Sequence, residues 1–186
     1  MKLETLKRIV FACVAVMLFG VAGTAAAQGY IGVGAGLTTF DLCDDLNALG
    51  ATSCDDKDIG WKLFGGYKFT PNFAVEGAWI DLGEVSALAG GATITGEVDG
   101  FQVAAVGIFP INPQFGIFGK VGAYMWDATV SAPGFVSESA DGTDIMFGAG
   151  VMWNVSQQLG IRAEWERFDI DGDGLDFLSV GVQFNF

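Results

Sequence analysis

Six charged residues in alternating segments are the first candidates for chemistry in this sequence. From Ile161 to Glu166 charged and apolar residues alternate, and successive side chains of a strand point to opposite faces. Three cations and three carboxylates that share a dry, narrow interior must pair, because unpaired buried charges are very costly. The pattern predicts buried ion pairs among Lys62, Glu76, Lys120, Arg162, Glu164 and Glu166. The alternative is a gated pore whose ion pairs can exchange.

The same residue types argue against catalysis. The chain contains no histidine, which is the commonest general base in enzymes. Glu164 and Glu166 share a strand face, but hydrolysis of a glycoside needs a substrate cleft, whereas these glutamates are expected to pair with buried cations. We therefore predict no enzymatic activity, no catalytic residues and no cofactor.

An acidic segment near the C-terminus resembles half of a calcium-binding loop. Aspartates alternate before Gly174, and alternating oxygen ligands followed by a glycine are typical of such loops. The position that should close the coordination shell is Val180, which has no oxygen in its side chain and is needed in a strand. We interpret the segment as a solvated acidic turn, and the alternative is a metal site formed by Asp169, Asp171 and Asp173.

The cysteines predict a disulfide. Cys13 lies in the N-terminal apolar segment, so Cys43 and Cys54 form the remaining pair. An even pair in an exported protein favours a disulfide, here between two positions of one polar loop. Two free thiols are the alternative.

The N-terminus has the pattern of a secretory signal peptide. Lys2, Lys7 and Arg8 precede an apolar run, which ends at the small residues before Gln28. We predict that residues 1–27 are removed and that residues 28–186 form one domain.

The whole chain has 9 basic and 22 acidic residues, so removing three basic residues and Glu4 leaves 6 against 21, a net charge of −15. Such an acidic chain does not bind nucleic acid by neutralising phosphates.

Eight alternating segments predict the fold. The chain is 51% hydrophobic with 28 glycines, but the predicted mature part has no apolar run long enough for a membrane helix. Three short turns and four longer loops join the segments, with loops expected at 39–57, 82–98, 127–143 and 169–175. The pattern predicts an all-β, eight-stranded antiparallel up-and-down transmembrane β-barrel. Its strands are expected at residues 30–37, 59–69, 73–81, 101–109, 114–126, 145–153, 159–168 and 178–186.

Aromatic residues support this assignment. Tryptophan, tyrosine and phenylalanine gather where a barrel crosses the two membrane surfaces. The outward face predicts one belt near the loops, with Trp61, Trp79 and Trp165. A second belt is predicted near the short turns, formed by Tyr67, Phe69, Phe73, Phe109, Phe115, Trp153, Phe184 and Phe186.

Together these segments resemble the transmembrane domain of the outer membrane protein A family. The resemblance covers residues 28–186 and rests on Phe64-Gly65-Gly66-Tyr67 with Pro71-Asn72 and Glu76, Gly100-Phe101-Gln102-Val103 with Pro110-Ile111, Lys120-Val121-Gly122 with Trp126, Phe147-Gly148-Ala149-Gly150-Val151, Arg162-Ala163-Glu164-Trp165, and Leu178 to Phe186. It implies a lumen network in which Lys120 and Arg162 match basic members. Where the family has a lysine and a glutamate, this chain has Val106 and Met152.

The final strand resembles the signal by which such barrels are recognised for assembly, with Gly181, Phe184 and Phe186 as its key residues. Because the chain ends at Phe186, we expect no periplasmic domain.

The expected location is the cell outer membrane, and the expected partners are the lipid bilayer, lipopolysaccharide and, during biogenesis, the barrel-assembly machinery. We expect a monomer with a structural or surface-interaction role and acidic extracellular loops. The alternative is a narrow pore or carrier for small solutes or apolar ligands.

Overall fold

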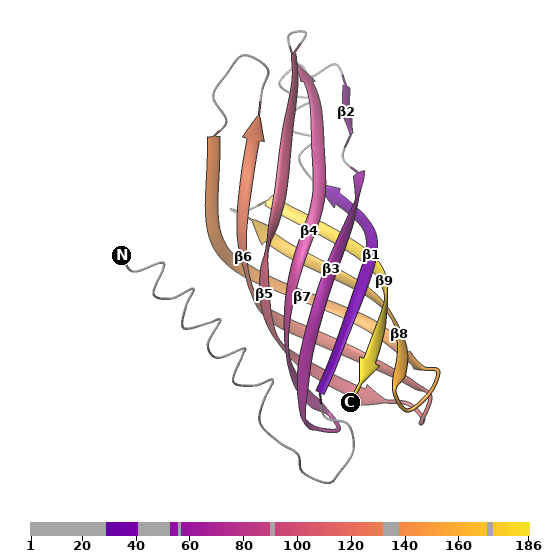
Figure 1. Ribbon diagram of the computed structural model, residues 1–186. Coiled ribbons are helices and arrows are strands. Elements are labelled where there is room, and N and C mark those ends of the chain that lie inside the picture. The colour runs from indigo at the N-terminus through magenta and orange to yellow at the C-terminus, as the bar shows by residue number, and fades with distance from the viewer. Residues whose placement is uncertain (1–28, 41–52, 56, 90–91, 132–137, 171–172) are drawn as a thin grey trace.

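The structure is a computed structural model that describes residues 29–40, 53–55, 57–89, 92–131, 138–170 and 173–186 (Figure 1). The predicted signal peptide lies outside these residues. The described strands are β1 (Gly29–Phe40), β2 (Ser53–Asp55), β3 (Lys57–Thr70), β4 (Phe73–Ala89), β5 (Ala92–Pro110), β6 (Phe115–Ser131), β7 (Glu138–Asn154), β8 (Leu159–Ile170) and β9 (Asp173–Asn185). No helix among the described residues is long and apolar enough to cross a membrane.

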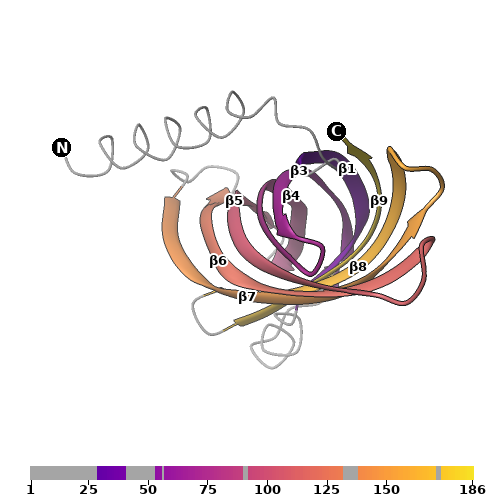
Figure 2. The ribbon, with the colours of Figure 1, turned by 90° about the horizontal axis from the view of Figure 1, so that it is seen from below.

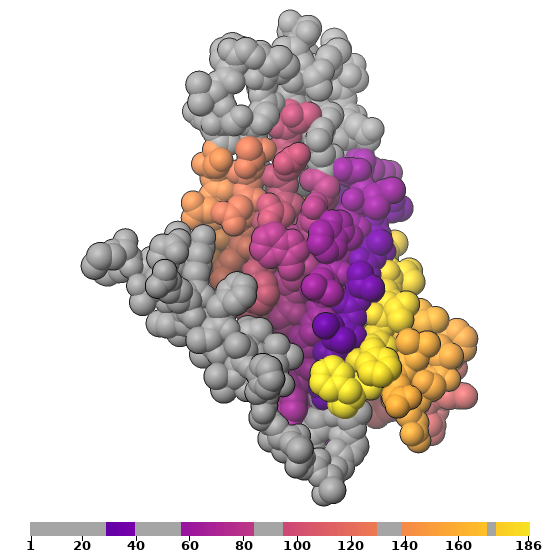
Figure 3. All heavy atoms as spheres, in the orientation of Figure 1, coloured from indigo at the N-terminus to yellow at the C-terminus, as the bar shows by residue number. Residues whose placement is uncertain are grey.

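Eight long strands close into an antiparallel barrel, as predicted. Their order is β4-β3-β1-β9-β8-β7-β6-β5, and an additional β4–β5 pairing joins the two ends (Figure 2). The first and last strands pair in a register that places Val33 opposite Val182. Figure 3 shows β1 and β9 side by side on the barrel wall. Closure gives every long strand two neighbours, so no unpaired edge faces the membrane.

Two of the predicted loops are wrong, because the strands continue into them. β4 runs to Ala89 and β5 begins at Ala92, inside the loop predicted at 82–98. β6 runs to Ser131 and β7 begins at Glu138, inside the loop predicted at 127–143. The backbone pairing continues past the outward apolar band of each strand, into segments that lack a regular alternation of large apolar residues. A search for alternating apolar residues therefore stops too early.

The other two loop predictions are partly corrected. The short strand β2 lies within the segment predicted as a loop at 39–57, and it pairs with the extension of β4. In the segment predicted at 169–175, β8 ends at Ile170 and β9 begins at Asp173. Alternation with apolar residues predicts only the part of each strand that carries an apolar face.

Three short turns share the same side-chain to backbone hydrogen-bond pattern. In each, a side-chain oxygen accepts hydrogen bonds from the backbone N–H groups two and three residues later, which closes a tight turn. Thr70 Oγ1 accepts from Asn72 and Phe73 at 3.2 and 3.1 Å. Asn112 and Ser156 do the same at distances of 2.8–3.2 Å. We call this end of the barrel the turn end and the opposite end the loop end.

The outward face is apolar, and its aromatic residues lie as predicted. Trp61 and Trp79 are 45% and 44% exposed near the loop end, while Phe69 and Phe73 are 62% and 64% exposed at the turn end. The indole N–H of Trp61 donates to Asp81 at 3.2 Å, and that of Trp165 donates to Asp176 at 3.0 Å. These tryptophans have one apolar side and one polar partner, which suits the boundary between hydrocarbon and headgroups.

The inward face pairs large side chains with glycines on neighbouring strands. Gly32 lies opposite Phe64, and Gly150 lies opposite Phe118. A Cβ atom at Gly150 would lie 2.6 Å from the Ala163 carbonyl oxygen and would also meet the Phe118 ring. Only glycine therefore leaves room for the ring, and this pairing lets eight strands enclose large side chains.

Candidate functional site

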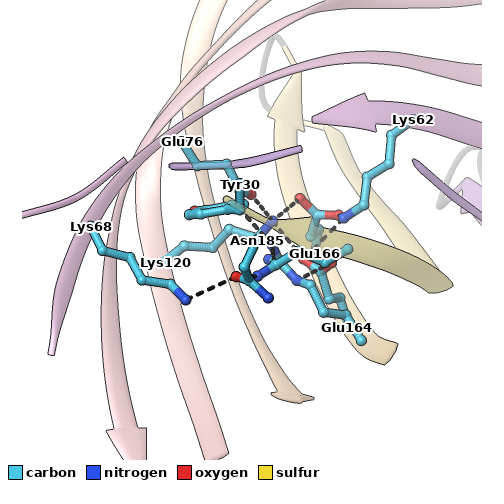
Figure 4. Close-up of polar contacts among 10 residues, drawn as sticks. Tyr30, Lys62, Lys68, Glu76, Lys120, Glu164, Glu166 and Asn185 are labelled. Carbon is cyan, nitrogen blue, oxygen red and sulfur yellow. Dashed lines mark hydrogen bonds and ion pairs between the residues drawn. The ribbon is translucent and has the colours of Figure 1, made fainter. Parts of the chain in front are cut away.

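The six predicted charged residues meet in the middle of the lumen, and we call them the ion cluster. They come from β3, β4, β6 and β8 and point toward one another (Figure 4). Their side chains are at most 3% exposed. Alternation along each strand turns these side chains inward. Only closure of the barrel brings charged side chains from four strands into contact.

Lys120 is the centre of the cluster. Its Nζ lies 3.2 Å from Glu76 Oε1, 2.7 Å from Glu164 Oε2 and 2.8 Å from Glu166 Oε1. Lys62 contacts Glu166, and its Nζ lies 3.0 Å from Glu164 Oε2. Each lysine thus bridges at least two carboxylates, which compensates for the water that both kinds of charge lose on burial.

Arg162 links the cluster to the aromatic wall. Its Nη1 lies 2.7 Å from Glu76 Oε2, and its Nε lies 3.0 Å from Glu164 Oε1. The guanidinium carbon also lies 4.5 Å from the ring centroids of both Phe64 and Phe118. A planar cation between two rings gains cation–π stabilisation, which is worth more in a desolvated site than at a surface.

Two uncharged residues that the ion-pair prediction omitted also belong to this network. The Tyr30 hydroxyl donates to Glu76 Oε2 at 2.9 Å, and Arg162 Nη1 donates to Gln183 Oε1 at 3.2 Å. Both residues lie on the inward phase of their strands, so the alternation could have identified them. Neither side chain is charged, so a prediction based on ion pairs does not include them.

An apolar layer covers the loop side of the ion cluster. Its members are large, come from four strands, and are at most 3% exposed: Ile80, Leu82, Met146, Phe168, Leu175 and Phe177. The Tyr124 ring packs against the Phe168 ring of this layer, with the two ring centroids 4.6 Å apart. The lumen is therefore blocked twice, by paired charges and then by packed apolar side chains.

The outward face carries four aspartates at the loop end. Strand register aligns Asp81 with Asp99, Asp99 with Asp127, and Asp127 with Asp141, across β4 to β7. We call these residues the aspartate row. Burial and the neighbouring carboxylates of Asp127 and Asp81 raise the pKa of Asp99. The loop predicted at 127–143 includes Asp127 and Asp141, but both residues lie on paired strands.

The other predicted sites are the disulfide, the metal site and the assembly signal. Cys43 and Asp171 lie outside the described residues, so the disulfide with Cys54 and the metal site remain predictions. Among the residues that the structure describes, no group of three or more potential metal ligands is found. Gly181, Phe184 and Phe186 of the predicted assembly signal lie on and just after β9, and Phe184 is 48% exposed on the outward face.

Comparison with known proteins supports the assignment that the fold suggests. The family model described as "Outer membrane protein beta-barrel domain" matches residues 11–186. This chain belongs to that family. Its location is accordingly the outer membrane, where short turns face the periplasm and longer loops face outward.

Relatives and solved structures agree with this assignment. The chain is 27% identical to the attachment invasion locus protein of Yersinia pseudotuberculosis over 134 residues, which cover 71% of this chain and 74% of that protein. It is 26% identical to outer membrane protein A of Klebsiella pneumoniae over 141 residues, covering 69% of this chain and 41% of that protein. The chain spans only 41–53% of the first outer membrane protein A relatives that it matches.

A solved structure shows the same fold. The attachment invasion locus protein of Yersinia pestis, crystallised with the heparin analogue sucrose octasulfate, superimposes with a TM-score of 0.61 at 21% identity. The match covers 87% of this chain and 100% of that chain.

Proposed function

We propose that this chain is an integral outer-membrane barrel with a structural and surface-interaction role rather than a transport role. The observation that carries the proposal is the double block of the lumen. The ion-cluster residues Lys120 and Glu76 have fully buried side chains, and Ile80 and Phe177 in the apolar layer are also fully buried. A barrel with a filled interior acts through its outer surfaces, here the bilayer-facing wall and the strands that project beyond it.

The charge of the projecting part supports a choice of partner. The aspartate row and a sequence with a net charge of −13 give an acidic loop end, which repels polyanions and attracts cationic surfaces. The related Yersinia pestis protein was crystallised with a polysulfated heparin analogue. We infer that this chain differs from it in ligand charge and does not bind such polyanions.

Adhesion of cells that display the protein tests this role. We expect such cells to adhere to polylysine-coated beads more strongly than control cells, and not to heparin-coated beads. A variant with Asp99→Asn and Asp127→Asn should lose part of the adhesion to polylysine. Preferential adhesion to heparin would contradict the proposed role.

A narrow pore is the second candidate, and buried polar atoms favour it. In the described lumen, Gln102, Tyr124, Thr38 and Ser179 have buried side-chain atoms without hydrogen-bond partners. Such groups normally bind water, and a chain of waters would offer a path for small solutes. Conductance of the purified protein in a planar bilayer separates the two candidates. The structural role predicts no reproducible channel, whereas a pore predicts a defined unit conductance.

We also propose that the chain is not an enzyme and functions as a monomer. The absence of histidine from the sequence and the occupation of the inward carboxylates by ion pairs support the first statement. Closure of the barrel supports the second, because each of the eight long strands already has two neighbours. Lipopolysaccharide and the assembly machinery remain proposed partners, and residues 1–27 a proposed signal peptide.

A further inference from the structure

We propose that the periplasmic mouth of the lumen holds a small monovalent anion on Lys68. The side chain points inward from β3 near the turn end and is half-buried. Its Nζ donates to Asn185 Oδ1 at 3.1 Å and lies 5.6 Å from the centre of the Tyr30 ring (Figure 4). No described carboxylate forms an ion pair with it.

The side-chain charge at this end of the barrel is unbalanced. The described turn-end segments, residues 29–35, 65–75, 105–119, 149–161 and 181–186, contain Lys68 as their one charged side chain. The ion cluster beyond it cannot supply a counter-charge, because its three cations already match its three carboxylates. Lys68 is therefore a surplus positive charge in a partly dry site, where an anion is attracted more strongly than at a surface.

A cavity with a suitable lining lies beside this lysine. It has a volume of about 10 Å³, enough for one water-sized species. Lys68, Arg162, Gln183 and Tyr30 provide its polar lining, and no carboxylate reaches it. Its remaining walls are apolar: Val106, Ile108, Phe118 and Met152. Arg162 is already paired with Glu76 and Glu164, so Lys68 is the unmatched cation of this lining. With an apolar wall and no acidic lining residue, the site favours a small anion such as chloride over a cation.

The neighbouring amides fit the same role. Asn185 Oδ1 accepts from Lys68 and also from Gln183 Nε2 at 2.7 Å, while Gln183 Oε1 accepts from Arg162. The two amides therefore use their oxygens to orient the two cations. An aspartate in place of Asn185 would put a permanent carboxylate at the point where Lys68 now has only a neutral oxygen.

The stability of the refolded protein in detergent tests the site. Urea midpoints are compared in sodium chloride and in sodium gluconate at equal ionic strength, because gluconate is too large for the cavity. We expect a higher midpoint in chloride for the unaltered protein, since a ligand that binds only the folded state stabilises it. Lys68→Gln and Asn185→Asp should each abolish this difference, the first by removing the site and the second by filling it. Lys57→Gln, the same substitution at an exposed position of β3, should keep it.

Bromide provides a direct measurement on the unaltered protein. Crystals soaked in sodium bromide should show an anomalous peak beside Lys68 Nζ. A chloride effect that persists in both Lys68→Gln and Asn185→Asp, or that disappears in Lys57→Gln, would overturn the proposal. The same holds for crystals with water alone in the cavity and no bromide peak, which would also decide the question if Lys68→Gln failed to fold.

Discussion

Arg162 and Lys120 show why a buried charge network is valuable only as a complete set. Each cation contacts at least two carboxylates, and each carboxylate contacts at least two cations. Removing one cation leaves acidic oxygens in a site that water does not reach. The cost therefore arises mainly from the residues that remain, rather than from the interaction that is lost.

The substitution Lys120→Ala should destabilise the folded barrel by about 3–5 kcal/mol, and Arg162→Ala by a similar amount, because each leaves buried carboxylates undercompensated. Urea unfolding in lipid vesicles measures this loss. Lys57→Ala removes the same charge from an exposed position and should change the midpoint little. Equal midpoints for Lys57→Ala and Lys120→Ala would contradict the role of the ion cluster.

A double-mutant cycle separates the interaction energy between Arg162 and Glu76 from their interactions with the rest of the ion cluster. Arg162 and Glu76 are in contact at 2.7 Å, so the double substitution Arg162→Ala with Glu76→Ala should cost less than the sum of the single ones. Strict additivity would mean that the contact contributes no coupling energy.

Gly150 makes a prediction about packing rather than charge. Because an added Cβ would lie 2.6 Å from a backbone oxygen and meet the Phe118 ring, Gly150→Ala should cost about 1–3 kcal/mol of stability. Gly119 on β6 faces outward and has its nearest atom at 3.8 Å, so Gly119→Ala is the matched control and should be tolerated. Thermal unfolding of the two variants compares them directly, and an equal loss at both sites would refute the argument.

The extensions of β4 to β7 are held by backbone pairing despite unfavourable side-chain charge. Like charges on directly opposite residues of neighbouring strands destabilise a sheet, and the aspartate row aligns four. Asp81 is partly compensated by the Trp61 indole and by the Gly83 N–H, which donates to Asp81 Oδ1 at 3.0 Å. Asp99, which lies opposite both Asp81 and Asp127, therefore experiences the strongest repulsion between carboxylates.

Asp99→Asn should raise the urea midpoint at pH 7 and low salt. The pKa of Asp99 is raised above its ordinary value of 3.8 by burial and neighbouring carboxylates, so the folded protein binds this proton more tightly than the unfolded chain. Stability from this group is thus present below the ordinary pKa and is lost as pH rises through the raised one. The gain from the substitution should shrink toward pH 4 and in high salt. Asp169→Asn, at an exposed position, should show no such gain, and a lower midpoint for Asp99→Asn would contradict the repulsion.

The predicted disulfide concerns the segment between β1 and β3. Cys54 lies on β2, which pairs with the extension of β4. If Cys43 and Cys54 are joined, the purified protein should contain no reactive thiol before reduction. Reduction should leave the barrel folded, because closing so short a loop contributes about 2–3 kcal/mol. Alkylation of both cysteines without reductant would refute the disulfide.

Closure of the whole barrel depends on its last residues. Phe186 N donates to Gly29 O at 2.9 Å, and Gly29 N donates to Phe186 O at 3.2 Å, so the two ends of the described chain pair directly. Deleting Phe186, or replacing Phe184 by lysine on the outward face, should prevent assembly in the outer membrane. Heat-modifiable mobility of the membrane fraction measures assembly, and normal mobility of the truncated chain would contradict the assigned signal. Val155→Lys in an exposed short turn is a control that should assemble.

Much of the molecule follows from the order of residues alone. Alternation fixes which face each strand turns to the lipid, because a shift by one residue would put Lys120 and Arg162 into hydrocarbon. The three short turns also follow from local sequence, since Thr70, Asn112 and Ser156 each bond to backbone groups within three residues. These features depend on neighbours in the chain, and neighbours are visible in a sequence.

Other features depend on which strands meet, and only the closed barrel decides that. The pairing of Lys120 with carboxylates of β4 and β8, the position of Arg162 between Phe64 and Phe118, and the alignment of the aspartate row all require a particular register between strands. The surplus charge of Lys68 follows in the same way, because it is established only once every other inward charge has a partner. Long-range register is a property of the closed sheet, and periodicity along one strand carries no information about it.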